Sequence, residues 1–133
     1  YDPQNEVLFA GDTVLGDNHS PVFSDLRAYL DTLRGLRDAV TIGTAIYPGH
    51  GAVIAEGQSA ISRTLQHRLE RHRDIIAAVR ELRSASEWAV VDRIYGDSLP
   101  LVLKRAARHT VRKHLQLAMA EGQVKLADGQ WTC

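Results

Sequence analysis

Cysteine is nearly absent from this 133-residue chain, and its scarcity excludes a fold stabilised by disulfides. The one cysteine, Cys133, is the last residue, so no disulfide can form within the chain. The fold must therefore depend on a hydrophobic core, and this cysteine usage fits a reducing compartment.

Long apolar runs are also lacking, whereas a membrane-spanning helix needs about 20 consecutive apolar residues. Residues 1–6 have neither the basic segment nor the apolar core of a signal peptide. We therefore expect no membrane association and a location in the cytoplasm or the mitochondrial matrix. A starting Met is missing too, and we expect the chain to be part of a longer polypeptide.

The zero net charge hides an asymmetry between the two parts of the chain. Residues 1–58 contain three Lys or Arg and eight Asp or Glu, a balance of −5, and residues 59–133 contain thirteen and eight, a balance of +5. An acidic part suits cations, and a basic part suits an anionic partner. Two ordinary solvated surfaces would explain the asymmetry equally well.

The first part of the chain has an α/β pattern. Short apolar runs at residues 7–10 and 45–47 end in turn residues and predict buried strands. Between them, apolar residues spaced by three and four predict a helix over residues 21–38, after a loop that begins at Gly16. Strand, helix and strand in this order indicate an α/β fold.

The second part is predicted to be helical with a final hairpin. One helix begins at Ser59 or Ser62, either of which would cap it, and ends near residue 83. A short helix over 88–95 and a long one over 99–120 follow, and Asp-Gly at 128–129 predicts a hairpin turn. This order is typical of a winged-helix-like domain. We expect two domains, 1–58 and 59–133.

The core of the second domain can be predicted from its aromatic and aliphatic residues. The long helix has an inner stripe made of Leu103, Ala107, Val111, Leu115 and Ala118. The aromatic residues expected to join this core are Trp88, Tyr95 and Trp131.

Asp12 and His50 are the first candidates for chemistry, because each follows the carboxyl end of a predicted strand. Functional groups collect at such ends, and a carboxylate and an imidazole are good zinc ligands. Taken alone, an Asp after a strand is more often a turn residue, and a His in a Gly/Pro loop is more often a surface residue.

Longer motifs around these two residues resemble the metallo-β-lactamase superfamily. Residues 8–16, LFAGDTVLG, are similar to its strand and bridging aspartate, and residues 47–51, YPGHG, to its last metal-binding histidine motif. The segment 22–30, Gln66-His67-Arg68 and the tail 86–133 resemble one branch. That branch holds lactamase-like endoribonucleases of mitochondria and acyl-carrier-protein thioesterases of fungal polyketide pathways.

This resemblance implies the second half of an αββα sandwich followed by a winged-helix-like domain. It implies two zinc ions in the intact protein, with Asp12 bridging them and His50 completing the second site. The upstream His-x-His-x-Asp-His motif of the family is missing here. We therefore expect a carboxyl-terminal fragment with no catalytic residue of its own. The missing amino-terminal half would be its partner, and the fragment alone would be inactive or would self-associate.

For the intact protein we favour a metal-dependent endoribonuclease that acts on single-stranded RNA. A thioesterase acting on acyl-carrier proteins or other thioesters is the alternative within the fold, and a non-enzymatic nucleic-acid-binding or interaction module is the alternative outside it. RNA or an acidic carrier protein would meet a basic cluster made of Lys104, Arg105, Arg108 and Arg112. A solvated outer helix face would explain the same cluster.

Three further histidines carry weaker expectations. His19 falls in the loop after Asp12, where a surface position is more usual than a metal site. His72 lies on the apolar stripe of its helix and is expected in the core. His67 matches the family's His-Arg pattern, but its chemistry assigns it no role.

Overall fold

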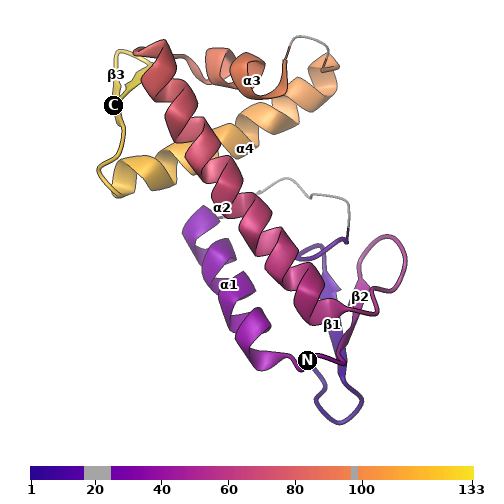
Figure 1. Ribbon diagram of the computed structural model, residues 1–133. Helices are drawn as coiled ribbons and strands as arrows, with labels where there is room; N and C mark the ends of the chain where they lie inside the picture. The colour runs from indigo at the N-terminus through magenta and orange to yellow at the C-terminus, as the bar shows by residue number, and fades with distance from the viewer. Residues whose placement is uncertain (17–24, 97–98) are drawn as a thin grey trace. The chain divides into compact units, whose positions relative to one another are not determined.

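The computed structural model describes residues 1–16, 25–96 and 99–133. Its elements follow in the order β1 (Val7–Gly11), α1 (Leu26–Ala39), β2 (Ala45–Pro48), α2 (Gly57–Leu82), α3 (Glu87–Tyr95), α4 (Leu101–Ala120), β3 (Lys125–Ala127) and β4 (Gln130–Thr132) (Figure 1). The chain divides into two compact units, Tyr1–Ser20 with Ala28–Arg68 and Pro21–Arg27 with Leu69–Cys133. The α2 helix continues from one unit into the other. The domain boundary expected near residue 58 stays a prediction.

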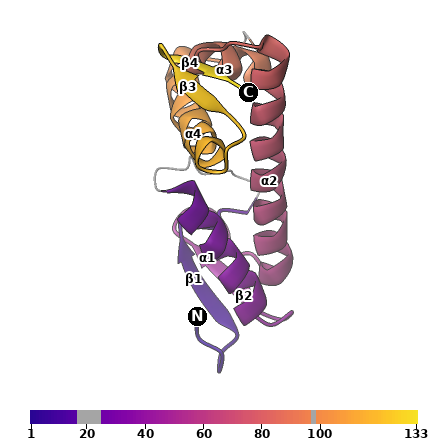
Figure 2. The same cartoon turned by 90° about the vertical axis from the view of Figure 1, so that its left-hand side faces the viewer.

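The first unit is built on a parallel pair of strands, β1 and β2, as the α/β pattern predicts. Phe9 pairs with Tyr47, and an irregularity after Phe9 then sets Gly11 opposite Pro48. Figures 1 and 2 show the first part of α2 beside these strands and α1 beside α2. Leu8 and Ile46 are buried, whereas Phe9 is 72% exposed. One face of the pair is therefore packed, and the other presents aromatic side chains to solvent.

The start of α2 is set by a backbone contact and not by a serine cap. The Gly57 N–H donates to the Thr44 carbonyl at 2.9 Å. A Cβ atom at residue 57 would lie 2.5 Å from that oxygen, so only glycine fits there. Ser59 and Ser62 lie inside the helix. The prediction that one of them caps it was therefore wrong.

The start of α1 is also later than the apolar spacing predicts. Among the described residues the helix begins at Leu26, and Asp25 precedes it outside any regular element. Residues 17–24 lie outside the described residues. They include the predicted loop after Gly16 and the first residues of the predicted helix.

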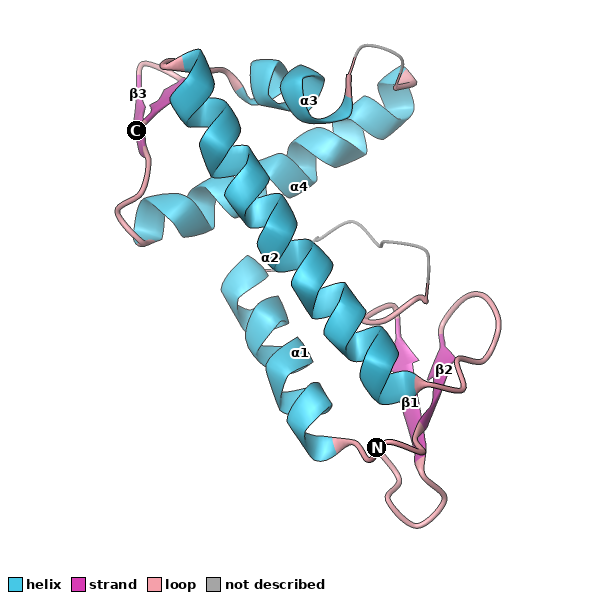
Figure 3. Cartoon of the chain, viewed as in Figure 1, coloured by secondary structure: helices cyan, strands magenta, loops and turns pink. Residues whose placement is uncertain are grey.

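The second unit contains the predicted order of two helices and a hairpin. The Ser86 side chain caps α3 by accepting from the Ala89 N–H at 3.2 Å. The β3 and β4 strands pair antiparallel, and positive φ angles at Asp128 and Gly129 form the expected Asp-Gly turn. Ala85 exchanges two backbone hydrogen bonds with Trp131, which adds a third short partner to the hairpin. Figure 3 shows the helices of this unit in cyan and its hairpin in magenta.

The core of this unit is one cluster of buried residues drawn from α2, α3, α4 and the hairpin. It consists of Ile75, Ile76, Ala78, Val79, Ala85, Val90, Val91, Val111, Leu115, Ala118, Val124 and Trp131. Tyr95 and Ala107 pack against it and are partly buried, as predicted.

Two residues expected in that core are exposed. Leu103 is 53% exposed because it lies in the first turn of α4, ahead of the helix residues that belong to the core cluster. Trp88 is 37% exposed, and the Arg108 guanidinium lies over its ring at 4.9 Å from the centroid. The predictions for Leu103 and Trp88 were therefore wrong, whereas Trp131 is 3% exposed, as expected. Among the described residues, no helix has the length and apolar character that a bilayer crossing requires.

Candidate functional site

The structure brings Asp12 and His50 together at one edge of the strand pair. Asp12 directly follows β1, and His50 lies two residues beyond β2. The carboxyl ends of parallel strands meet at the same edge of a sheet, so both side chains start from that edge. The His50 Nε2 atom lies 3.7 Å from the Asp12 Oδ1 atom. The two residues that the sequence analysis singled out are therefore neighbours.

Gly49 allows this close approach. Its N–H donates to the Gly11 carbonyl at 2.7 Å, which holds the His50 loop against the end of β1. A Cβ atom at residue 49 would lie 2.7 Å from the Asp12 Oδ1 atom and 3.2 Å from the Gly11 carbonyl carbon. Any larger residue would therefore displace the carboxylate or the loop.

The geometry and the ligand types of the pair fit one edge of a zinc coordination sphere. Two ligand atoms that each lie about 2.0–2.1 Å from a tetrahedral zinc ion are roughly 3.4 Å apart. The observed 3.7 Å is within a few tenths of an ångström of this separation. The two side chains are 63% and 82% exposed, so both are accessible to an ion. As a salt bridge, a pair this exposed would contribute little stability.

The pair does not complete a metal site by itself. Within residues 1–16, 25–96 and 99–133, no group of three or more His, Cys, Asp or Glu side chains is arranged to hold an ion. Asp12 and His50 would thus fill two of the four positions of a tetrahedral site, and the remaining ligands would have to come from elsewhere.

Three of the four residues of the predicted basic cluster pair with acidic residues of α3. Lys104 binds Asp92 of α3 at 2.6 Å, and its side chain is only 17% exposed. Arg108 and Arg112 donate through their Nε atoms to Glu87, at 2.7 and 2.6 Å. Arg105, Arg108, His109 and Arg112 line a small shared hollow of about 120 Å³. The cluster therefore contains a pocket that excludes Lys104.

Glu87 is the acidic centre of this arrangement. Burial raises the pKa of its carboxyl, but hydrogen bonds from Arg112 and Arg108 outweigh that effect and leave the pKa below its ordinary value of 4.5. The roles of Glu87 and Trp88 in this cluster could not be predicted from the sequence, because nothing in the linear pattern links α3 to the arginines of α4.

The remaining histidines have different surroundings. His72 is buried, as expected, and its Nδ1 atom lies 3.3 Å from the Nδ1 atom of His114. Its Nε2 atom lies 3.5 Å from a Glu121 carboxylate oxygen. His67 is half-buried on α2, where the structure adds no role for it. His19 lies outside the described residues.

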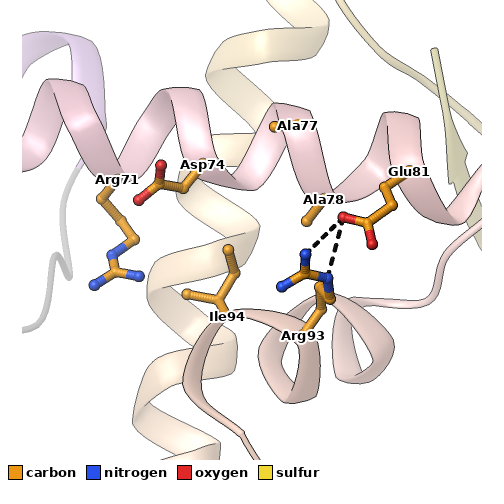
Figure 4. Close-up of a pocket in the computed structure, with 7 residues that line it drawn as sticks. All are labelled: Arg71, Asp74, Ala77, Ala78, Glu81, Arg93 and Ile94. Carbon is orange, nitrogen blue, oxygen red and sulfur yellow. Dashed lines mark hydrogen bonds and ion pairs between the residues drawn. The ribbon is translucent and has the colours of Figure 1, made fainter.

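A larger hollow, of about 300 Å³, lies between α2 and α3 (Figure 4). Its charged residues are Arg71, Asp74, Glu81 and Arg93. Arg93 pairs with Glu81 at 2.7 Å, and Arg71 lies over the Tyr95 ring. Both signs of charge are present in equal number, so this hollow has no preference for an anion or a cation.

Comparisons with known proteins show what the chain is related to. Residues 86–131 match the model of the beta-lactamase associated winged helix domain. The chain is 33% identical over 122 residues to the beta-lactamase-like protein 2 homolog of Caenorhabditis elegans, covering 92% of this chain and 40% of that protein. It is 35% identical over 105 residues to the atrochrysone carboxyl ACP thioesterase of Aspergillus fumigatus, covering 70% and 32%.

Solved structures show the same fold. A beta-lactamase domain protein from Burkholderia ambifaria superposes with a TM-score of 0.83 at 22% identity, over 99% of this chain and 42% of that one. A metallo-beta-lactamase family protein from Thermus thermophilus gives a TM-score of 0.80 at 20% identity, over 98% and 42%.

The chain is therefore a relative of the beta-lactamase-like proteins, and it shares the fold of metallo-β-lactamase family structures. Its fold is part of the metallo-β-lactamase fold followed by the winged-helix domain that accompanies it, as the resemblance implied. Its relatives carry the names beta-lactamase-like protein 2, lactamase-like protein nscB and atrochrysone carboxyl ACP thioesterase. The chain spans about two fifths of the length of the Caenorhabditis relative.

Proposed function

We propose that this chain supplies Asp12 and His50 to the metal centre of a metal-dependent hydrolase. The observation that carries the proposal is the 3.7 Å separation of their ligand atoms at the edge of a parallel strand pair. The resident metal would be zinc, two ions in the complete centre, and it would supply Lewis-acid chemistry for hydrolysis. Asp12 and His50 would be two of the residues that hold these ions.

The remaining ligands would come from a further segment of the same fold. Two observations support this: the described residues offer two ligands where four are needed, and the Phe9 and Tyr47 side chains leave an aromatic sheet face uncovered. That segment would cover the aromatic face and complete the centre. The chain alone would then be inactive.

For the substrate, we propose single-stranded RNA, which is supported by the arginine pocket on α4. The second candidate is an acyl thioester, supported by the thioesterase name of the Aspergillus fumigatus relative. Both reactions need an activated water and a site for developing negative charge, so the metal centre alone does not separate them. A non-enzymatic binding module is the third candidate, and it requires no role for Asp12 or His50.

The proposal is tested on the longest polypeptide that the gene encodes, loaded with zinc and assayed on a single-stranded RNA and on an acyl thioester. Asp12→Ala and His50→Ala should each lower the rate on the true substrate at least 100-fold, since each removes a metal ligand. Glu56→Ala, which removes an exposed carboxylate elsewhere in the first unit, should keep the rate unchanged. Full activity of both ligand variants on both substrates would refute the hydrolase proposal.

A further inference from the structure

Three arginines and a histidine form a cationic pocket on one face of α4. Arg105, Arg108 and Arg112 recur at spacings of three and four, so they share a helix face, and His109 joins them as a lining residue. From Arg105 to Arg112 the face extends about 10 Å along the helix. This helix face is therefore long enough to contact an extended anion, although the hollow itself is small, about 120 Å³.

The pocket keeps a positive charge after its internal pairing. Glu87 accepts from Arg108 Nε and from Arg112 Nε and Nη2, and its side chain is 14% exposed. The two arginine side chains are 38% and 44% exposed. The Glu87 carboxylate thus pairs with two guanidinium groups. With Arg105, the pocket has three guanidinium groups and one carboxylate, so its net charge is positive.

The position of this charge on the helix is a second observation. The positive end of a helix dipole is at its N-terminus, so cations in the first turn of a helix lower its stability. The sequence of α4 contains no acidic residue, and Lys104 ends its first turn with Arg105 directly after it. Glu87 and Asp92 compensate part of this cost. The remaining charge suits an external anion.

An aromatic ring lies next to the arginines. Trp88 of α3 packs beneath the Arg108 guanidinium, and about a third of the residue is exposed. Cationic grooves flanked by exposed aromatic rings bind single-stranded nucleic acids, because phosphates pair with guanidinium forks and bases stack on the ring. This combination favours a nucleic acid strand over an acidic protein.

We infer that Arg105, Arg108, His109 and Arg112 hold the phosphates of single-stranded RNA while a base packs against the exposed part of Trp88 that Arg108 does not cover. Glu87 is a positioning residue that fixes Arg108 and Arg112, and Lys104 lies outside the groove. The inference rests on the proposed function, since it assigns the RNA-binding surface of the same protein. An acidic carrier protein is the competing ligand, because exposed Leu101 and Val102 continue the same helix face.

The test measures binding of the 133-residue chain to a fluorescein-labelled 12-nucleotide oligouridylate by anisotropy. EDTA is present, so that cleavage plays no part. Arg105→Ala should weaken binding about three- to tenfold and reduce the slope of log affinity against log salt by about 0.7. Arg80→Ala, which removes an exposed arginine from α2 in the same unit, should have no effect. RNA should also quench the fluorescence of exposed Trp88, and Trp88→Leu should abolish the quenching because Trp131 is buried.

Equal RNA affinity of Arg105→Ala and the unchanged chain would overturn the inference, and so would binding of an acyl-carrier protein in place of RNA. Asp12→Ala should bind RNA like the unchanged chain. The binding assay therefore tests the arginine groove alone, because Asp12 has no part in it. The hydrolase proposal is tested by the effect of Asp12→Ala in the rate assay.

Discussion

Replacing Glu87 with Gln tests how far the α3–α4 pairing stabilises the second unit. The substitution keeps the size of the side chain but removes the charge that accepts three hydrogen bonds from Arg108 and Arg112. Hydrogen bonds to a charged group contribute about 1.5–3 kcal/mol, roughly twice the neutral value. Solvent screening at the two arginines, 38% and 44% exposed, reduces this loss. Glu87 also lies in the first turn of α3, where a negative charge adds about 0.3–1 kcal/mol.

These contributions together predict a loss of about 1–2 kcal/mol at pH 7, measured as a shift of the urea midpoint. The pKa of Glu87 is lowered in the folded protein, so its contribution is fully present above its ordinary value of 4.5 and is lost as the pH falls through the folded value. The stability difference between the Gln variant and the unchanged protein should therefore be constant near neutral pH and close below pH 4.5.

A double-mutant cycle with Arg112→Ala isolates the pair from other effects of either change. We expect a coupling energy of about 1 kcal/mol at pH 7. Equal stability of the Gln variant and the unchanged protein at pH 7 would refute this role of Glu87. A difference in the free energy of unfolding that is as large at pH 3 as at pH 7 would refute it too.

Two other predictions concern the first unit. Gly49→Ala should weaken zinc binding by Asp12 about 10- to 100-fold, because the new methyl group would lie 2.7 Å from the carboxylate oxygen. Gly35→Ala, whose Cβ atom meets nothing within 4 Å, is the matched control in a zinc titration of the longest gene product, and equal losses in both variants would contradict the argument. Changing both Phe9 and Tyr47 to Ser should reduce self-association of the chain, since their rings form an exposed aromatic pair. Sedimentation of the unchanged chain as a monomer at high concentration would exclude this.

The candidate metal ligands were predictable because their signals are local. Apolar runs ended by turn residues predict β1 and β2, and parallel pairing then requires the residues after both strands to meet at one edge. Ser86 and the Asp-Gly turn are local signals too, since a cap and a type I′ turn depend on a few consecutive residues.

The features that sequence reasoning missed depend on tertiary contacts. The start of α2 is fixed by the contact of Gly57 with the Thr44 carbonyl, which no helix-capping rule contains. Trp88 was expected in the core because large aromatic residues usually are, but Arg108 from a different helix covers its ring near the surface. In the sequence Glu87 looks like any acidic residue in the first turn of a helix. Its two arginine partners lie 21 and 25 residues further along the chain.

The irregular pairing after Phe9 has a consequence for which length changes this protein can tolerate. Since Phe9 pairs with Tyr47 and Gly11 with Pro48, β1 has one more residue than β2 in that interval, and the surplus residue sets Asp12 beside Gly49. Deleting a paired residue such as Leu8 would shift part of β1 against β2 by about 3.3 Å and turn its side chains to the opposite side of the sheet. Deleting the surplus residue between Phe9 and Gly11 would instead leave Gly11 opposite Pro48. Single-residue deletions should therefore be tolerated better at this surplus position than at the paired positions of β1.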